Sequence, residues 1–308
     1  MQNGNGTKSR LFMSLLLVAV LAISALGLFG CSSDDEGNGD GASDDKGTIR
    51  IGWIPWDEDV AVTYLWKNIL EGEGYDVELT QLDVAPVFDG VGNGDLELFF
   101  DAWLPVTHSD YWAEYGDSIE DLAVWYDKGL LTWAVPEYSD ATSIEDLVGM
   151  EDAFDGQIIG IEPGSGLMRI SREDVVPGYG LDDYTVIEGS TPAMLAELDR
   201  ATGAEENVVV TLWRPHWAYG AYPIRDLEDP KGLLGEAEEL HALARDGFTA
   251  DFSEVAAWIG NFTMDDDSLA SLSKLVISDY DAGDEEAAVS EWLEDEANQA
   301  LVDGWLGK

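Results

Sequence analysis

Apolar and polar positions in this chain follow two different periods from residue 48 onward. Apolar residues at every second position, or in a short continuous block, predict strands, whereas apolar residues three or four positions apart predict helices. Glycine, proline and capping residues separate these runs. The predicted strands are 48–55, 75–82, 96–105, 122–138, 157–164, 184–190, 207–213 and 238–248, and the predicted helices are 57–74, 85–94, 109–116, a segment opening at Ser143, 165–176, 191–203 and 252–308.

The alternation of strand and helix occurs twice along the chain. Such alternation predicts open sheets with helices on both faces. Because 122–138 and 238–248 are placed to cross between two such sets, we expect a bilobal α/β fold. Lobe 1 would span 48–137 and lobe 2 138–245, with a helical segment, 246–308, returning to lobe 1. In open α/β sheets ligands bind at the carboxyl ends of strands, so the cleft between the lobes is the expected site.

The first 30 residues differ in character from the rest. A short basic region precedes an uncharged apolar run, 11–30, which either spans a bilayer as a permanent anchor or is removed as a signal segment. The letters LFGC, which end at Cys31, resemble a lipobox, where a bacterial-type lipoprotein is cut and lipidated. The acidic Gly/Ser/Asp stretch 31–47 predicts an extended tether. We therefore expect a leader in 1–30, lipidation at Cys31, and a domain held at the outer face of the cytoplasmic membrane.

Charge narrows the possible partners. The formal net charge is −48, with 63 acidic residues against 15 lysines and arginines. A surface this acidic repels nucleic acid and anionic lipid headgroups. We interpret it as adaptation to high salt, where ions screen the self-repulsion, and an ordinary acidic secreted protein remains the alternative. The chain contains no HExxH or CxxC motif, and its three histidines are not spaced as metal ligands, so we expect neither a metal nor a cofactor.

Tryptophans stand at the ends of three predicted strands, in GWIPW, DAWLPVTH and TLWRPHW. Trp56 follows the first strand, Trp103 ends the third, and Trp213 ends the strand 207–213. Three indole faces can enclose a cation without any carboxylate, through attraction to the ring quadrupole. Such a box favours a methylated ammonium, which has no N–H to donate and loses little hydration on entry.

A second motif, IGIEPGSGLM, predicts an anion site. A strand ends at Glu162, a glycine-rich turn follows, and a helix then opens with its backbone N–H groups exposed. With no GxGxxG and no GK[ST] ending, a carboxylate fits this turn better than a nucleotide. We interpret the acids Asp57, Glu58 and Glu162 as chance neighbours in a chain with 63 acids, not as a glycosidase pair.

Together these four motifs resemble the substrate-binding protein of glycine betaine ABC transporters, over residues 48 to about 300. The resemblance implies a type II periplasmic-binding-protein fold with its ligand between the lobes. It also implies a ligand whose trimethylammonium lies among three tryptophans and whose carboxylate meets backbone amides. Carried over by position, it implies an ammonium cage of Trp56, Trp103 and Trp213 and a carboxylate site of Gly166, Leu167 and the side chain of His108.

The expected function is therefore capture of glycine betaine outside the cytoplasm and delivery to the permease and ATPase of an ABC importer. We expect a monomer and no enzymatic activity. Choline, carnitine and proline betaine stay open as ligands of the same kind of site. A surface carbohydrate-binding protein or glycosidase is the alternative of another class, in which the tryptophans stack on sugar rings. That alternative needs carboxylates or polar side chains beside the indoles, where the sequence predicts apolar and amide neighbours.

Overall fold

The computed structural model describes residues 46–308, which belong to one compact unit. The predicted leader 1–30, the lipidation site Cys31 and all but the last two residues of the predicted tether 31–47 lie outside the described residues. Within the described part of the chain, none of the helices has the length and apolar character needed to cross a membrane.

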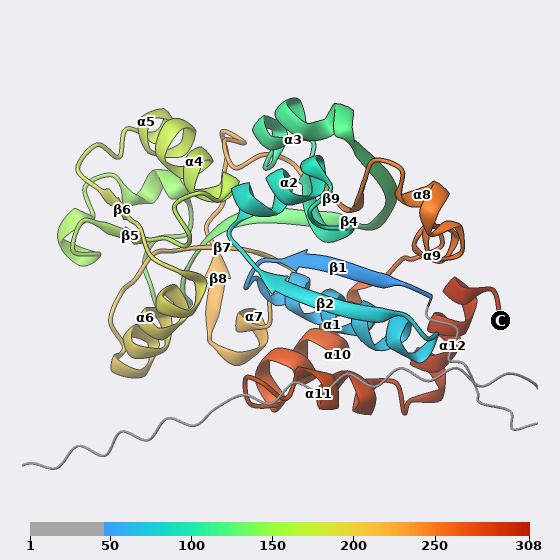
Figure 1. Ribbon diagram of the computed structural model, residues 1–308. Coiled ribbons are helices and arrows are strands. Elements are labelled where there is room, and N and C mark those ends of the chain that lie inside the picture. The colour runs from blue at the N-terminus through green and yellow to red at the C-terminus, as the bar shows by residue number, and fades with distance from the viewer. Residues whose placement is uncertain (1–45) are drawn as a thin grey trace, which may run out of the picture. The chain divides into compact units, whose positions relative to one another are not determined.

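The strands of the described residues join edge to edge in the order β2-β1-β3-β9-β4-β7-β5-β6, and β8 pairs with β4 (Figure 1). Strands β1, β2 and β3 run parallel, as do β5, β6 and β7, and each set meets β4 or β9 in antiparallel pairing. Their bounds are β1 Thr48–Trp53, β2 Asp76–Gln81, β3 Leu98–Leu104, β4 Ile119–Pro136, β5 Gln157–Ile159, β6 Thr185–Ile187, β7 Val210–Arg214, β8 Ile224–Asp226 and β9 Glu238–Arg245.

Strand β4 connects the two halves of the molecule. It pairs with β9 as far as Gly129 and then, from Leu130, with β7 and later β8. A Cβ at Gly129 would lie 2.7 Å from a ring carbon of Trp103, so glycine is needed where the indole packs over the strand. The predicted type II architecture of two α/β lobes joined by crossing strands is confirmed. We use lobe 1 for the part built on β1–β3 and lobe 2 for the part built on β5–β7; the exact lobe boundaries stay a prediction.

Helices cover both sets of strands (Figure 1). Short 3₁₀ helices lie at Gly116–Ser118, Ile144–Leu147 and Glu151–Ala153, and π-helical turns at Ser171–Val175 and Lys274–Asp279. The α-helices are α1 Asp57–Gly72, α2 Val84–Asn93, α3 Ser109–Tyr115, α4 Gly166–Ile170, α5 Val176–Tyr179, α6 Thr191–Ala204, α7 Ala218–Ala221, α8 Phe248–Asp251, α9 Ser253–Ile259, α10 Asp266–Ser273, α11 Glu285–Trp292 and α12 Glu296–Leu306.

Three details differ from the predicted elements. The strand expected over 157–164 ends at Ile159, and a Cβ at Gly160 would lie 2.3 Å from the Met168 sulfur, so α4 packs directly over the strand end. The helical segment 252–308 is divided, because a capping box at Asp265 starts α10 and Gly283 has a φ of +102° before α11. The short edge strand β8 carries no clear hydrophobic period and was not predicted.

The core of lobe 1 is strongly aromatic and includes the C-terminal segment. Trp66 of α1 stacks on Phe100 of β3 at a centroid distance of 5.6 Å and meets Phe262 edge-on at 5.3 Å. Trp305 of α12 packs on Phe262 at 4.8 Å, and α10 and α11 pack against α1. These indoles contribute buried area to the fold and are separate from those at the strand ends.

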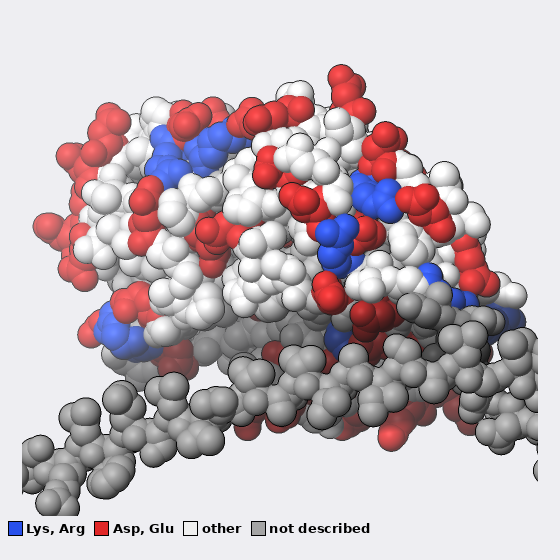
Figure 2. All heavy atoms as spheres, in the orientation of Figure 1, with Lys and Arg blue, Asp and Glu red and all other residues white. Residues whose placement is uncertain are grey.

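The visible face of the molecule is densely acidic (Figure 2). Red acidic side chains are scattered over the part of this face that is not grey, and the few blue basic side chains lie beside them. One such ion pair in the described residues joins Arg200 and Glu197 at 2.7 Å. Exposed pairs of this kind contribute little to stability. The acidic excess is therefore a property of the surface, and the fold rests on the apolar core.

Candidate functional site: a tryptophan-lined cavity between the lobes

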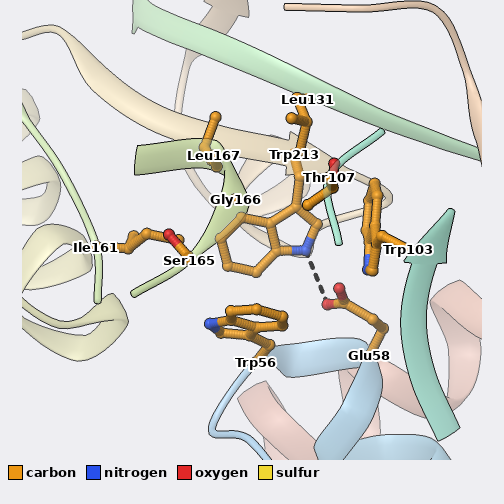
Figure 3. Close-up of a pocket in the computed structure, with 10 residues that line it drawn as sticks. All are labelled: Trp56, Glu58, Trp103, Thr107, Leu131, Ile161, Ser165, Gly166, Leu167 and Trp213. Atoms are coloured by element: carbon orange, nitrogen blue, oxygen red, sulfur yellow. Dashed lines mark hydrogen bonds between the residues drawn. The ribbon is translucent and has the colours of Figure 1, made fainter. Parts of the chain in front are cut away.

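Three indoles from separate elements converge on one small cavity (Figure 3). Trp56 precedes α1, Trp103 lies near the end of β3 in the same lobe, and Trp213 lies near the end of β7 in lobe 2. The structure thus brings together residues that are far apart in the sequence. The residues that line the cavity are Trp56, Glu58, Trp103, Thr107, Leu131, Ile161, Ser165, Gly166, Leu167 and Trp213.

The three indoles are almost fully buried and are held by their neighbours. Their exposed fractions are 5% for Trp56, 2% for Trp103 and 3% for Trp213. The rings of Trp56 and Trp213 lie 6.4 Å apart with an interplanar angle of 57°, so they face the cavity from two directions. A cation enclosed by such rings is desolvated, where each cation–π contact is worth about 2 kcal/mol or more.

The glycine-rich turn of lobe 2 forms another wall of the cavity (Figure 3). Ser165 caps α4 by accepting a hydrogen bond from the Met168 N–H at 3.3 Å. The first N–H groups of a helix have no acceptor within the helix, so those of Gly166 and Leu167 are available to an anion. Gly166 lies against lobe 1 so closely that a Cβ there would be 2.1 Å from the Thr107 carbonyl oxygen.

His108 occupies a different place from the one expected at the cleft edge. Its exposed fraction is 0%, it does not line the cavity, and its ring stacks on Trp56 at 5.7 Å. Nδ1 accepts a hydrogen bond from the backbone N–H of Trp103 at 2.9 Å, so the proton of the neutral ring is on Nε2, which has no hydrogen-bond partner among the described residues. Burial, with a smaller effect of Arg169, lowers the pKa of His108 to about 3. His108 is therefore a neutral N–H donor next to the cage.

Carboxylates surround the cage, contrary to the expectation of apolar and amide neighbours alone. Glu58 lines the cavity and accepts the Trp213 indole N–H at 2.8 Å, as the dashed line in Figure 3 marks. Each of the other two indoles also donates to a buried carboxylate: Trp56 to Glu162 at 3.2 Å and Trp103 to Asp101 at 3.0 Å. The expectation that only apolar and amide groups lie beside the indoles was therefore wrong.

Two of these carboxyl groups and their neighbour Asp59 form a buried acidic cluster. Burial raises the pKa of Glu58 to about 8 and that of Asp59 to about 7. Burial, reinforced by Glu58 and Asp59, also raises the pKa of Asp101 well above its ordinary range. A cation in the adjacent cavity would favour the ionised form of Glu58. A cationic group in the cavity can therefore be neutralised by a carboxyl group of this cluster that loses its proton.

Residues 47–295 match the family described as the substrate binding domain of ABC-type glycine betaine transport systems. The chain belongs to this family. Its members are extracytoplasmic transport proteins that bind a small substrate, and they are not a class of enzymes. The cavity is therefore the candidate substrate site of a betaine-family binding protein. Among residues 46–308, His, Cys, Asp and Glu do not gather into a group that could hold a metal ion.

Two solved structures of glycine betaine binding proteins are similar to this chain over most of its length, and a curated relative is similar over less than half of it. The ProX glycine betaine/L-proline-binding protein of Borrelia burgdorferi is 28% identical, with a TM-score of 0.78 over 84% of this chain and 96% of its own. Lactococcal OpuAC, in its closed form with glycine betaine, is 30% identical, with a TM-score of 0.78 over 84% of this chain and 99% of its own. The glycine betaine/carnitine transport binding protein GbuC of Listeria monocytogenes is 30% identical over 138 residues, which are 44% of this chain and 45% of GbuC.

In this betaine-family protein, Glu58→Gln should change how stability depends on pH. Because Glu58 keeps its proton in the fold up to about pH 8 while an unfolded chain ionises near 4.5, the folded state binds the extra proton between these values. Its contribution to stability therefore falls as pH rises from 4.5 to 8. Between pH 5 and pH 8 the Tm of the variant should rise relative to that of the wild type by about 7 °C, measured by calorimetry without ligand.

The control for this measurement is Glu78→Gln, which changes an exposed carboxylate on β2. Its Tm difference from wild type should be the same at the two pH values. A Glu58→Gln difference that does not change with pH would show that Glu58 ionises normally in the folded protein, and would remove the argument for a protonated carboxyl beside the cage.

Proposed function

We propose that this chain captures glycine betaine in the cavity between its lobes. The observation that supports the proposal is the convergence of Trp56, Trp103 and Trp213 on the cavity that the N-terminus of α4 also borders. One wall suits a methylated cation and the other a carboxylate, and these are the two ends of a betaine.

In this proposal the trimethylammonium lies among the three indoles. The carboxylate accepts hydrogen bonds from the N–H groups of Gly166 and Leu167, and His108 Nε2, which has no partner in the described residues, is the third donor of the proposal. Hydrogen bonds to a charged group contribute about 1.5–3 kcal/mol each. His108 suits this role because its tautomer is set by Trp103 and it stays neutral over the physiological pH range.

Because lobe 1 contributes two indoles and lobe 2 contributes the third together with the amides, the site is complete only when the lobes are closed. Ligand binding then favours closure through contacts that the open form lacks. The closed protein would deliver its ligand to the permease and ATPase of an ABC importer. We propose that it acts as a monomer, anchored to the outer face of the membrane by a lipid on Cys31.

The surface charge supports a saline setting for this function. A net charge of −48 repels itself strongly in dilute buffer, and salt screens the repulsion. Cation–π contacts in a closed cavity are much less exposed to bulk ions than surface pairs are. We therefore propose an osmoprotective role in a halophile, in which the site retains its affinity in brine.

Choline is the second candidate, because Glu58 lies in the cavity and its carboxylate would neutralise a monocation. The two ligands require different protonation states of Glu58. Glycine betaine has no net charge and binds beside the protonated carboxyl, whereas choline needs the carboxylate. Since the pKa of Glu58 is about 8, choline binding should tighten markedly between pH 6 and pH 8, and glycine betaine binding should change little.

Calorimetric titration in concentrated salt tests the proposed function. Glycine betaine should give saturable binding, and choline at pH 7 should bind at least about 10-fold more weakly because it lacks the carboxylate. Carnitine, proline betaine and a set of simple sugars complete the panel. Absence of heat with glycine betaine, or tighter binding of choline or a sugar, would contradict the assignment.

A further inference from the structure

Two of the cage indoles donate their N–H groups across the cleft, in opposite directions. Trp56 of lobe 1 donates to Glu162 of lobe 2 at 3.2 Å. Trp213 of lobe 2 donates to Glu58 of lobe 1 at 2.8 Å. The third indole differs, since Trp103 donates to Asp101 of its own strand. The two cross-lobe hydrogen bonds exist only when the lobes are together.

Each cross-lobe acceptor is held in place by its own lobe. Glu162 receives the Thr191 N–H at 2.8 Å on Oε1 and the Thr191 hydroxyl at 2.9 Å on Oε2, at the N-terminus of α6. Glu58 lies in the first turn of α1, and its Oε2 accepts the Trp213 indole N–H while the carboxyl group keeps its proton. Both carboxyl groups are buried, with exposed fractions of 9% and 2%. The acceptors are therefore presented before the opposite indole arrives.

We propose that Glu162 and Glu58 are positioning residues that form a reciprocal closure latch, in which each holds the cage tryptophan of the opposite lobe. This inference rests on the proposed function for its ligand, although the hydrogen bonds themselves do not depend on it. The rings of Trp56 and Trp213 turn their faces to the cavity while their N–H edges are fixed by the latch. Closing the lobes thus orients the cage in the same movement that encloses the ligand.

Because the latch forms only when the lobes close on the bound ligand, it should affect mainly the rate of ligand dissociation. A hydrogen bond between an indole and a carboxyl group shielded from water is lost only when the lobes separate, so weakening it speeds opening. Encounter with the open form does not involve it, and the association rate should stay unchanged. This division between rates separates a latch from a residue that merely supports the fold of one lobe.

Glu162→Gln tests the latch with little change in shape. Both oxygens of Glu162 accept from N–H or O–H donors, so the amide group of glutamine faces a donor in either orientation. We expect about a 10-fold faster dissociation of glycine betaine, measured by stopped-flow tryptophan fluorescence, and an association rate within 2-fold of wild type. Equal dissociation rates for variant and wild type would overturn the proposal.

The matched control is the cross-lobe ion pair at the rim of the cleft. Arg169 of lobe 2 lies 3.3 Å from Asp110 of lobe 1, and the Asp110 side chain is 75% exposed. Asp110→Asn removes a cross-lobe contact outside the cage and should leave the dissociation rate within about 2-fold of wild type. A rise as large as that of Glu162→Gln would show that any cross-lobe contact controls release, which contradicts a latch specific to the cage.

Two further measurements keep the latch separate from the ligand assignment and from folding. If the wild type binds none of the betaines, the proposed function fails, and small-angle scattering without ligand tests the latch. A larger radius of gyration for Glu162→Gln than for the wild type supports the latch, and an equal radius overturns it.

If Glu162→Gln does not fold, Thr191→Val is the second variant, because it removes only the hydroxyl that donates to Oε2 of Glu162. That variant should raise the dissociation rate about 3-fold, and no rise would count against the latch.

Discussion

Replacing Trp103 with alanine should weaken glycine betaine binding about 100-fold, which corresponds to about 2.8 kcal/mol. Trp103 is buried, borders the cavity and presents one of the three ring faces (Figure 3). Its removal costs one cation–π contact, about 2 kcal/mol in a desolvated site, together with apolar contact to the ligand methyl groups. Titration calorimetry in high salt measures the effect. Trp103→Phe, which keeps a smaller aromatic ring, should bind glycine betaine about 10-fold more weakly than the wild type.

A tryptophan from the same set of motifs provides the control. Trp53 lies at the end of β1, is half-buried and contacts Tyr64 edge-on at 6.2 Å, away from the cavity. Trp53→Ala should lower Tm but leave the affinity within about 2-fold. If Trp103→Ala binds as tightly as the wild type, the ring does not contact the ammonium and the cage assignment is wrong.

Gly166→Ala should weaken glycine betaine binding by about 100-fold. The added Cβ would lie 2.1 Å from the Thr107 carbonyl oxygen and 2.7 Å from its Cγ2. Because Gly166 is in lobe 2 and Thr107 in lobe 1, this clash acts between the lobes and is relieved by opening them. Overpacking that cannot relax typically costs about 1–3 kcal/mol, and here it opposes closure at the carboxylate wall. Calorimetry gives the affinity, and scattering with saturating ligand should show an open molecule.

The neighbouring glycine of the same turn is the matched control. A Cβ at Gly164 would meet Val84 at 3.7 Å and the Tyr111 hydroxyl at 3.9 Å, which are ordinary contacts. Gly164→Ala should therefore bind within about 3-fold of wild type. Equal affinities for the two variants would mean that closure does not bring Gly166 against Thr107, and the geometry of the carboxylate wall would have to be revised.

Local pattern was enough to predict the architecture and much of the cavity. Periods of two and 3.6 residues arise from strand and helix geometry itself. The alternation of strands and helices can therefore be predicted from residues that are close in the sequence. In open α/β folds the strand ends meet at one edge, so tryptophans at the ends of β3 and β7 and after β1 were expected to share a site. The glycine-rich turn before α4 was recognisable for the same reason, because its chemistry is local.

The partners of the indoles were beyond local pattern. The Trp213–Glu58 hydrogen bond joins residues 155 positions apart, and Trp56–Glu162 joins residues 106 apart. In a chain with 63 acids, residue type alone does not identify the few that will be buried, so Glu58 and Glu162 were interpreted as chance neighbours. A signal was nevertheless present: Glu58 follows Trp56 by two positions, and Asp101 precedes Trp103 by two.

Residue pattern was sufficient for the order of strands and helices, the acidic surface, and the position of three indoles and one glycine-rich turn at strand ends. Three-dimensional packing was needed to show that His108 is buried against Trp56, that Gly166 lies against Thr107, and that carboxyl groups of the opposite lobe hold two of the cage indoles. This difference arises because backbone periodicity depends on residues a few positions apart. Burial, pKa and cross-lobe hydrogen bonds depend instead on which distant groups exclude water from one another.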